Sequence, residues 1–160
     1  MPHPAAEVEA TLARYVAVRE AIEAGEQSWS DLAQFFTDDA VYIDPAWGRI
    51  QGIDTIREFL VESMTGLEDW RFPLLFTAVN GDDVVTVWRQ IVPGTRPDGG
   101  PFVQTGVSLL RYAGRGKFSF EEDLLNMTHV LEDLAASRWR PGPGFSIPPD
   151  NPNRDVSRPA

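Results

Sequence analysis

The stretch that decides the fold of this 160-residue chain is residues 35–45, which read FFTDDAVYIDP. Its two phenylalanines close an apolar helical face, and the apolar run from Ala40 to Ile43 predicts a short strand. Asp44-Pro45 and Gly48 end that strand, because proline has no N–H to give to a sheet ladder. The stretch therefore predicts a helix-to-strand junction with one acid, Asp44, at the end of the strand.

Apolar spacing around this junction predicts three helices. Residues 7–24 carry apolar side chains three and four positions apart, which is typical of an amphipathic helix, and Gly25 ends it. Ser28 and Ser30 are suitable N-caps for a second helix. A third helix is expected from Ile53 to Met64, where the apolar side chains again share one side.

The second half of the chain changes to the period of two that is typical of strands. The β-branched run 84–92 and the run 103–112 predict long strands, Asn80-Gly81 is a strong hairpin signal, and a last strand begins at Phe118. Helices followed by such a meander predict an α+β fold.

Composition limits the classes of function. The net charge of −10 and the lack of a basic stripe argue against nucleic acid, and no apolar run is long enough for a membrane span. Without cysteine and without a His/Asp/Glu cluster we expect no metal and no cofactor, and a cytoplasmic location. We expect one domain over residues 1–140 and a proline-rich, extended or disordered tail over residues 141–160.

Strand alternation indicates that both faces of the sheet are substantially apolar. In the 84–92 strand, Arg89 lies on the face opposite Trp88. We expect the helices to cover one face, with Arg89 and Asp123 toward an internal pocket, and Trp88 on the other side. The uncovered face predicts a homodimer through the sheet, with coverage by the tail as the alternative.

The run from Phe35 to Pro45, together with Gly48, Gly52 and the segment 56–59, resembles the ketosteroid isomerase-like, SnoaL-like domains of the nuclear transport factor 2-like superfamily. The resemblance covers about residues 8–130. It implies a cystatin-like fold, a cone-shaped curved antiparallel sheet packed on three N-terminal helices. It also implies a pocket for a small apolar organic ligand, although this fold hosts many reactions.

The resemblance to ketosteroid isomerase implies roles for individual residues. The acid before the proline is that family's general base, which matches Asp44. The first-helix tyrosine that donates to the developing oxyanion matches Tyr15. The acid that serves as the second oxyanion donor falls on Ser108 here, so half of that pair is changed.

Two other family members point to further residues. The water-positioning pair of limonene epoxide hydrolase resembles Tyr42 and Asp44, and its arginine and last-strand acid resemble Arg89 and Asp123, but Ile91 replaces its second acid. SnoaL-type polyketide cyclases use an acid on the last strand, which again indicates Asp123. Their pocket histidine has no match, since the chain contains only two histidines, His3 and His129.

The residues themselves leave alternatives open. Asp44 lies between apolar neighbours near Trp47, which we expect at the pocket mouth. Burial there would raise its pKa and make it a base. The alternative is that Asp44 caps the turn at Pro45, as Asp-Pro pairs often do. Tyr15 is suited to a core position, and Arg89 with Asp123 to a structural ion pair.

Two hypotheses about function follow. The first is a cofactor-free enzyme that acts on a small, largely apolar molecule by acid/base catalysis, as an isomerase, cyclase or hydrolase. Asp44, Tyr15 and Asp123 are its catalytic candidates, and Tyr42, Trp47, Arg89 and Ser108 its substrate-binding candidates. The second is a non-catalytic binding or accessory domain that uses the same pocket or the sheet face.

Overall fold

A curved six-stranded sheet forms the centre of the molecule in the computed structural model, which describes residues 1–159. The strands lie in the order β2-β1-β6-β5-β4-β3. Every neighbouring pair is antiparallel except β1 and β6, which run parallel. The strands are β1 (Phe36–Asp44), β2 (Gly48–Gln51), β3 (Leu74–Asn80), β4 (Asp83–Thr95), β5 (Pro101–Tyr112) and β6 (Phe118–Leu125).

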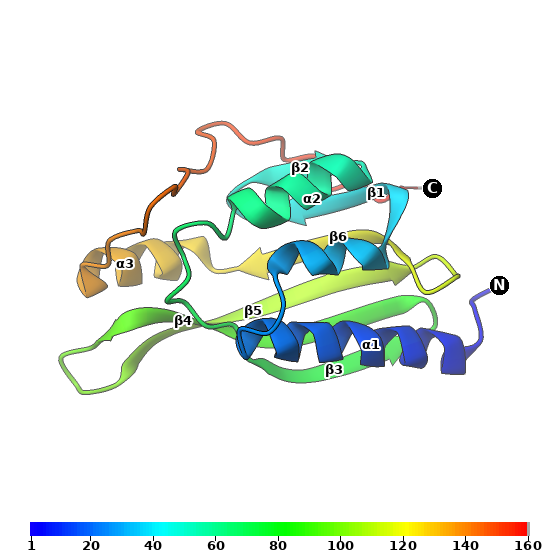
Figure 1. The fold of residues 1–160 in the computed structure, drawn as a ribbon, viewed down its shortest axis with the longest axis horizontal. Coiled ribbons are helices and arrows are strands. Elements are labelled where there is room, and N and C mark those ends of the chain that lie inside the picture. The colour runs from blue at the N-terminus through cyan, green and yellow to red at the C-terminus, as the bar shows by residue number, and fades with distance from the viewer. Residues whose placement is uncertain (160) are drawn as a thin grey trace.

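Four helices accompany the sheet and confirm the predicted α+β fold. They are α1 (Ala5–Glu23), the 3-10 helix η1 (Trp29–Phe35), α2 (Ile53–Glu62) and α3 (Met127–Ser137). The first three lie over one face of the sheet, and α3 lies at one end of the molecule (Figure 1). Their apolar sides and the inner sheet face form the main core.

The boundaries of β1 and of the last strand differ most from the sequence prediction. β1 begins at Phe36 rather than Ala40, because Phe36 already pairs with Phe118 on β6. The last strand ends at Leu125, where Asn126 starts α3 by accepting the backbone N–H of His129 on its side chain (3.3 Å). Helix α3 was not predicted, since its cap lies inside a run that continues the strand pattern.

The side of the sheet that faces the helices was assigned wrongly for β4. Trp88 lies on the inner, buried face, and Arg89 lies on the outer face. Gly106 explains this orientation, because it pairs with Trp88 across β4 and β5 and leaves room for the indole ring. A Cβ on Gly106 would lie 2.4 Å from ring atoms of Trp88.

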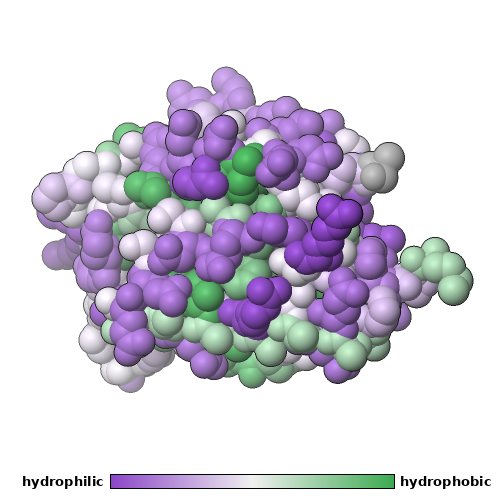
Figure 2. Space-filling view, turned by 45° about the vertical axis from the view of Figure 1, so that its right-hand side comes forward, coloured by the Kyte–Doolittle hydropathy of each residue, from purple (hydrophilic) through white to green (hydrophobic). Residues whose placement is uncertain are grey.

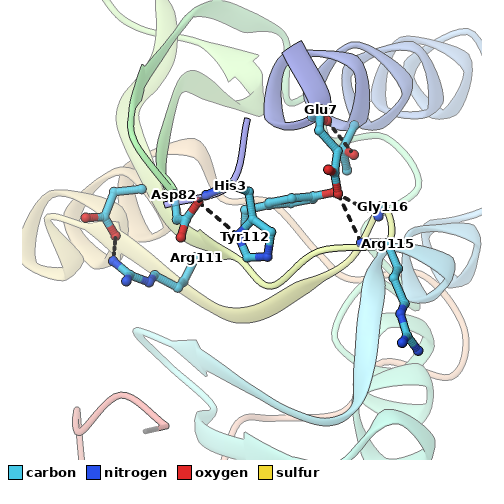
Figure 3. Close-up of polar contacts among 9 residues, drawn as sticks. His3, Glu7, Asp82, Arg111, Tyr112, Arg115 and Gly116 are labelled. Carbon is cyan, nitrogen blue, oxygen red and sulfur yellow. Dashed lines mark hydrogen bonds and ion pairs between the residues drawn. The ribbon is translucent and has the colours of Figure 1, made fainter. Parts of the chain in front are cut away.

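The first turn of α1 is tied to the sheet by polar contacts (Figure 3). The backbone N–H of His3 donates to Asp82 Oδ1 (2.8 Å), and His3 Nδ1 lies 3.1 Å from the same oxygen. Tyr112 donates its hydroxyl to Glu7 Oε1 (2.5 Å) and accepts the backbone N–H of Gly116 (3.0 Å). These contacts fix the helix that carries Tyr15, so they position the site from outside.

The residues after α3 follow an extended path without helix or strand up to residue 159. This C-terminal segment runs along the α2 side of the molecule (Figure 1), where Gly142 N–H donates to Gly66 O (2.9 Å). Arg49 N–H donates to Asn153 O (2.9 Å) at the β2 edge, and Arg158 then lies over the Phe120 ring (5.1 Å). The segment therefore wraps from the helices to the outer sheet face.

The outer sheet face is apolar and only partly covered. Its β4 and β5 side chains, among them Val85, Val87 and Val107, are half-buried, and Phe76 on β3 is 58% exposed.

The side of the molecule drawn in Figure 2 carries mainly hydrophilic residues, with hydrophobic residues between them. Within residues 1–159, no helix has the length and apolar character needed to cross a membrane.

Candidate active site

A cavity of about 260 Å³ opens between the inner sheet face, the helices and the C-terminal segment. All five tryptophans of the chain line it, together with three phenylalanines. The aromatic lining consists of Trp29, Trp47, Phe59, Trp70, Phe72, Trp88, Trp139 and Phe145. A cavity of this size and character fits a small, largely apolar molecule.

Asp44 lies in the wall of this cavity at the end of β1. Its Oδ1 accepts the backbone N–H groups of Ala46 and Trp47, each at 2.8 Å, so it does cap the turn. Its Oδ2 accepts no hydrogen bond from residues 1–159 and is left to the cavity. Burial, and next the charge of Asp123, raise the pKa of Asp44 from 3.8 to about 6, against the lowering effect of the two N–H groups.

Asp123 is the centre of a hydrogen-bonded chain on the sheet. Its Oδ2 accepts the Tyr42 hydroxyl (2.5 Å), and its Oδ1 accepts the Ser108 hydroxyl (2.6 Å). Ser108 in turn accepts the indole N–H of Trp88 (3.0 Å). Burial raises the pKa of Asp123, although both hydroxyls favour its charged form. These hydrogen bonds fix the Asp123 carboxyl in one orientation at the cavity wall.

Glu121 is a buried acid that was not singled out from the sequence. It is 2% exposed, its Oε1 accepts the Tyr15 hydroxyl (3.3 Å), and its Oε2 has no partner among the described residues. Burial, then the neighbouring Asp123 charge, raise its pKa well above the usual value. The signal was present, since residues 121 and 123 alternate onto one strand face between apolar residues.

The cation beside these acids is Arg19, not Arg89. Arg89 was expected to face the cavity, but it lies half-buried on the outer face, where it donates to the Thr105 hydroxyl. The parity of β4 causes this, since Trp88 occupies the inner face. Arg19 lies four residues after Tyr15, one turn along the same face of α1, and lines the cavity. Its place in the apolar stripe of that helix was the available signal.

The remaining predicted residues are distributed as follows. Tyr15, Tyr42, Asp44, Trp47 and Asp123 all line the cavity. Ser108 is buried behind Asp123 and reaches the cavity only through it. The two histidines lie outside the cavity lining.

Two carboxyl groups with raised pKa values, Asp44 and Asp123, line this apolar cavity, and a third, Glu121, is buried beside Asp123. Such carboxyls are suited to proton transfer. With its pKa raised to about 6, Asp44 can accept a proton near neutral pH, while burial holds the proton of Glu121 more strongly. Across residues 1–159 no group of three or more His, Asp or Glu side chains is placed to hold a metal ion. The arrangement can therefore supply a base and a proton donor from its own side chains.

Both the sequence and the fold of the chain are similar to those of known proteins. A family model described as the SnoaL-like domain matches residues 12–120. No curated protein matches the chain.

Several solved structures share the fold. A candidate SnoaL-like polyketide cyclase from Jannaschia sp. CCS1 is 17% identical, with a TM-score of 0.63 over 88% of this chain and 99% of that one. TerC, co-crystallised with polyporic acid, is 18% identical, with a TM-score of 0.61 over 81% and 98%. A protein with a ketosteroid isomerase-like fold from Catenulispora acidiphila, in complex with trimethylamine, is 21% identical, with a TM-score of 0.55 over 79% and 97%. At these identities the likeness shows the fold alone.

Proposed function

Because the chain belongs to the family of SnoaL-like domains, we propose that its cavity is an active site for acid/base catalysis on a small, largely apolar organic molecule. The observation that carries the proposal is Asp44. A half-buried carboxyl with a pKa of about 6 and one free oxygen, in the wall of an aromatic cavity, has the properties of a general base.

The simplest step is proton transfer next to a carbonyl group. Asp44 Oδ2 removes a proton from the carbon, and the electron pair of that C–H bond moves to the carbonyl oxygen to give an enolate. The same carboxyl then returns the proton to a conjugated carbon, so the net reaction is an isomerisation. In a ring closure the enolate carbon instead bonds to an internal carbonyl carbon, and the proton goes to the oxygen of that carbonyl. This chemistry needs no cofactor.

The other cavity residues have supporting roles in this proposal. The Asp123 carboxylate, whose charged form the Tyr42 and Ser108 hydroxyls favour, raises the proton affinity of Asp44 through its charge. Tyr15 lines the cavity, and its hydroxyl, which donates to Glu121 in the free protein, donates to the substrate oxygen instead. Trp47 packs beside Phe59, with ring centroids 6.1 Å apart, and supplies apolar contact to the substrate.

A direct test uses 2-tetralone, an aromatic ketone with exchangeable α-protons, in D₂O at pH 7. We expect the protein to accelerate hydrogen–deuterium exchange measured by NMR. Asp44→Asn should lower the enzymatic rate by roughly 10²–10⁴-fold, the usual share of a general base. Asp39→Asn is the matched control, because Asp39 is an exposed aspartate on the same strand. Equal exchange by wild type and Asp44→Asn would remove Asp44 from the mechanism.

The second candidate is a non-catalytic domain that binds small molecules in the same cavity. Co-crystals of TerC with polyporic acid and of the Catenulispora protein with trimethylamine favour a ligand-binding role in general. Tight binding of aromatic ketones with no exchange above the buffer rate would support this alternative.

We also propose that the protein is a homodimer through the outer sheet face. The half-buried valines of β4 and β5 and the exposed Phe76 form an apolar surface there. Light scattering should give twice the chain mass, and Val87→Glu, in the middle of this face, should give the monomer mass. A monomeric wild type would favour the alternative, in which the C-terminal segment alone covers the face.

A further inference from the structure

Arg19 is a buried cation without a counter-charge in direct contact. Its side chain is 5% exposed, and guanidinium keeps its charge in proteins. Among residues 1–159 it forms no ion pair; its Nη2 donates to the backbone oxygen of Phe72 (3.0 Å), and the uncharged Tyr15 hydroxyl interacts with the guanidinium. Its Nε has no acceptor in the described part of the chain. Such a charge is costly to bury, so it calls for a function.

Aromatic rings hold the guanidinium but do not satisfy it. The Arg19 Cζ lies over the rings of Trp29 and Trp88, at 5.2 and 6.0 Å from their centroids. These contacts favour a cation and fix its plane, but they offer no acceptor to Nε. Trp70, which also lines the cavity, has a second unpaired donor. Its buried Nε1 has no acceptor in residues 1–159.

The acids in and behind the cavity wall accept hydrogen bonds from other groups. Glu121 and Asp123 influence Arg19 through their charges, but the Tyr15 hydroxyl donates to Glu121, and the Tyr42 and Ser108 hydroxyls donate to Asp123. Asp44 binds the N–H groups of its own turn. The protein therefore provides hydroxyl and amide donors for its carboxyls and leaves the guanidinium without a carboxylate in direct contact.

We infer that Arg19, with Trp70, binds an anionic oxygen substituent of an aromatic ligand, such as a carboxylate or phenolate, apart from the carbon at which Asp44 acts. A planar oxyanion matches the flat donor edge of guanidinium. The tryptophan rings around it contact the hydrocarbon part. The inference rests on the proposed function only because both take the cavity as the ligand-binding site. It narrows the expected ligands to aromatic acids.

The test compares three probes of one shape by isothermal titration calorimetry at pH 7.5. They are 2-naphthoate, its neutral isostere 2-isopropylnaphthalene, and the cationic 2-(aminomethyl)naphthalene. Wild type should bind naphthoate at least about tenfold more tightly than either other probe, the usual effect of a hydrogen-bonded charge. Arg19→Met should lose this preference and bind the hydrocarbon within about threefold of wild type. Arg14→Met is the matched control, an exposed arginine of the same helix, and should keep the preference.

Further variants keep the test decisive. Arg19→Lys retains the charge and should keep a preference for naphthoate, while Trp70→Phe should weaken naphthoate by a larger factor than it weakens the hydrocarbon. If Arg19→Met shows no thermal unfolding transition and is therefore not folded, the affinities of these two variants test the inference in its place. Asp44→Asn should keep the naphthoate preference even if it abolishes α-proton exchange, so the two proposals fail separately. Equal affinity of wild type for naphthoate and the hydrocarbon, or a preference that survives Arg19→Met, would overturn the inference.

Discussion

Asp44 combines two properties that the sequence presented as alternatives. One oxygen caps the turn after β1, and the other is left to the cavity. The cap holds the carboxyl in place, while burial raises its pKa to about 6. Asp44 is thus both a turn cap and the proposed base: Oδ1 caps the turn, and Oδ2 is the oxygen proposed to accept the proton.

The raised pKa of Asp44 should appear in the stability of the protein. The folded state binds this proton more tightly than the unfolded chain, so the free energy of unfolding should fall as pH rises from about 4 to 6 and level off above. The loss attributable to Asp44 should be roughly 2–3 kcal/mol. Urea unfolding of wild type and Asp44→Asn across this range measures it, and parallel curves for the two proteins would contradict it.

Ser108 should matter more for stability than its size suggests. Ser108→Ala leaves the indole N–H of Trp88 and one oxygen of Asp123 without their partner, at a cost of roughly 2–3 kcal/mol in the free energy of unfolding. Ser119→Ala is the control, a half-buried serine of β6. Chemical denaturation should separate the two variants, and an equal loss in both would argue against the hydrogen-bonded chain.

At the scale of elements, the order of helices and strands was predictable apart from β2 and α3, but the side of each strand that faces the helices was not. The alternation of β4 was plain in the sequence, yet both faces are apolar, so alternation alone could not say which face meets the helices. Gly106 on the neighbouring strand resolves it, because only the face with that glycine has room for Trp88. The orientation of β4 therefore depends on which residue of β5 pairs with Trp88. The sequence of β4 alone does not contain that pairing.

The same register predicts a severe effect of a small substitution. Gly106→Ala places a methyl group 2.4 Å from the Trp88 ring, so the indole must move and the free energy of unfolding should drop by roughly 1–3 kcal/mol. Gly100→Ala, which meets only the flexible Asp98 side chain, should cost much less. Thermal melting compares them, and a Gly106→Ala variant as stable as wild type would contradict the packing described.

Site residues were predictable to the extent that a family motif or a strand face marks them. Asp44, Tyr15 and Asp123 were named in advance and line the cavity, and their catalytic roles stay predictions. Arg19 was missed because an arginine on an amphipathic helix is ordinarily at the edge of the apolar face. Its full burial depends on Trp29 and Trp88, which approach it only in the folded chain.

At the scale of the whole molecule, the C-terminal segment closes the cavity. Phe145 and Pro148 line it, and Phe145 packs against Trp139 with ring centroids 5.9 Å apart. The predicted boundary at residue 140 therefore separates the sheet and helices from part of the cavity wall. We predict that the first 140 residues fold without this segment, and truncation of the chain tests that prediction.

A chain of residues 1–140 should keep its far-UV circular dichroism and expose the cavity. We expect acrylamide to quench its tryptophan fluorescence more strongly than that of the full chain, since all five tryptophans line the cavity. Phe145→Ala in the full chain should give a smaller change in the same direction. Identical quenching of truncated and full-length protein would show that the segment does not cover the site in solution.

The most direct measurement of the central claim is the pKa of Asp44 in the folded protein, which requires no substrate. Carboxyl ¹³C shifts of aspartate-labelled protein, titrated from pH 3 to 8 and assigned by comparison with Asp44→Asn, isolate this one group. A cavity base tuned for proton transfer predicts a pKa of about 6. An ordinary value near 3.8 would contradict the claim, because Asp44 would then be only a turn cap.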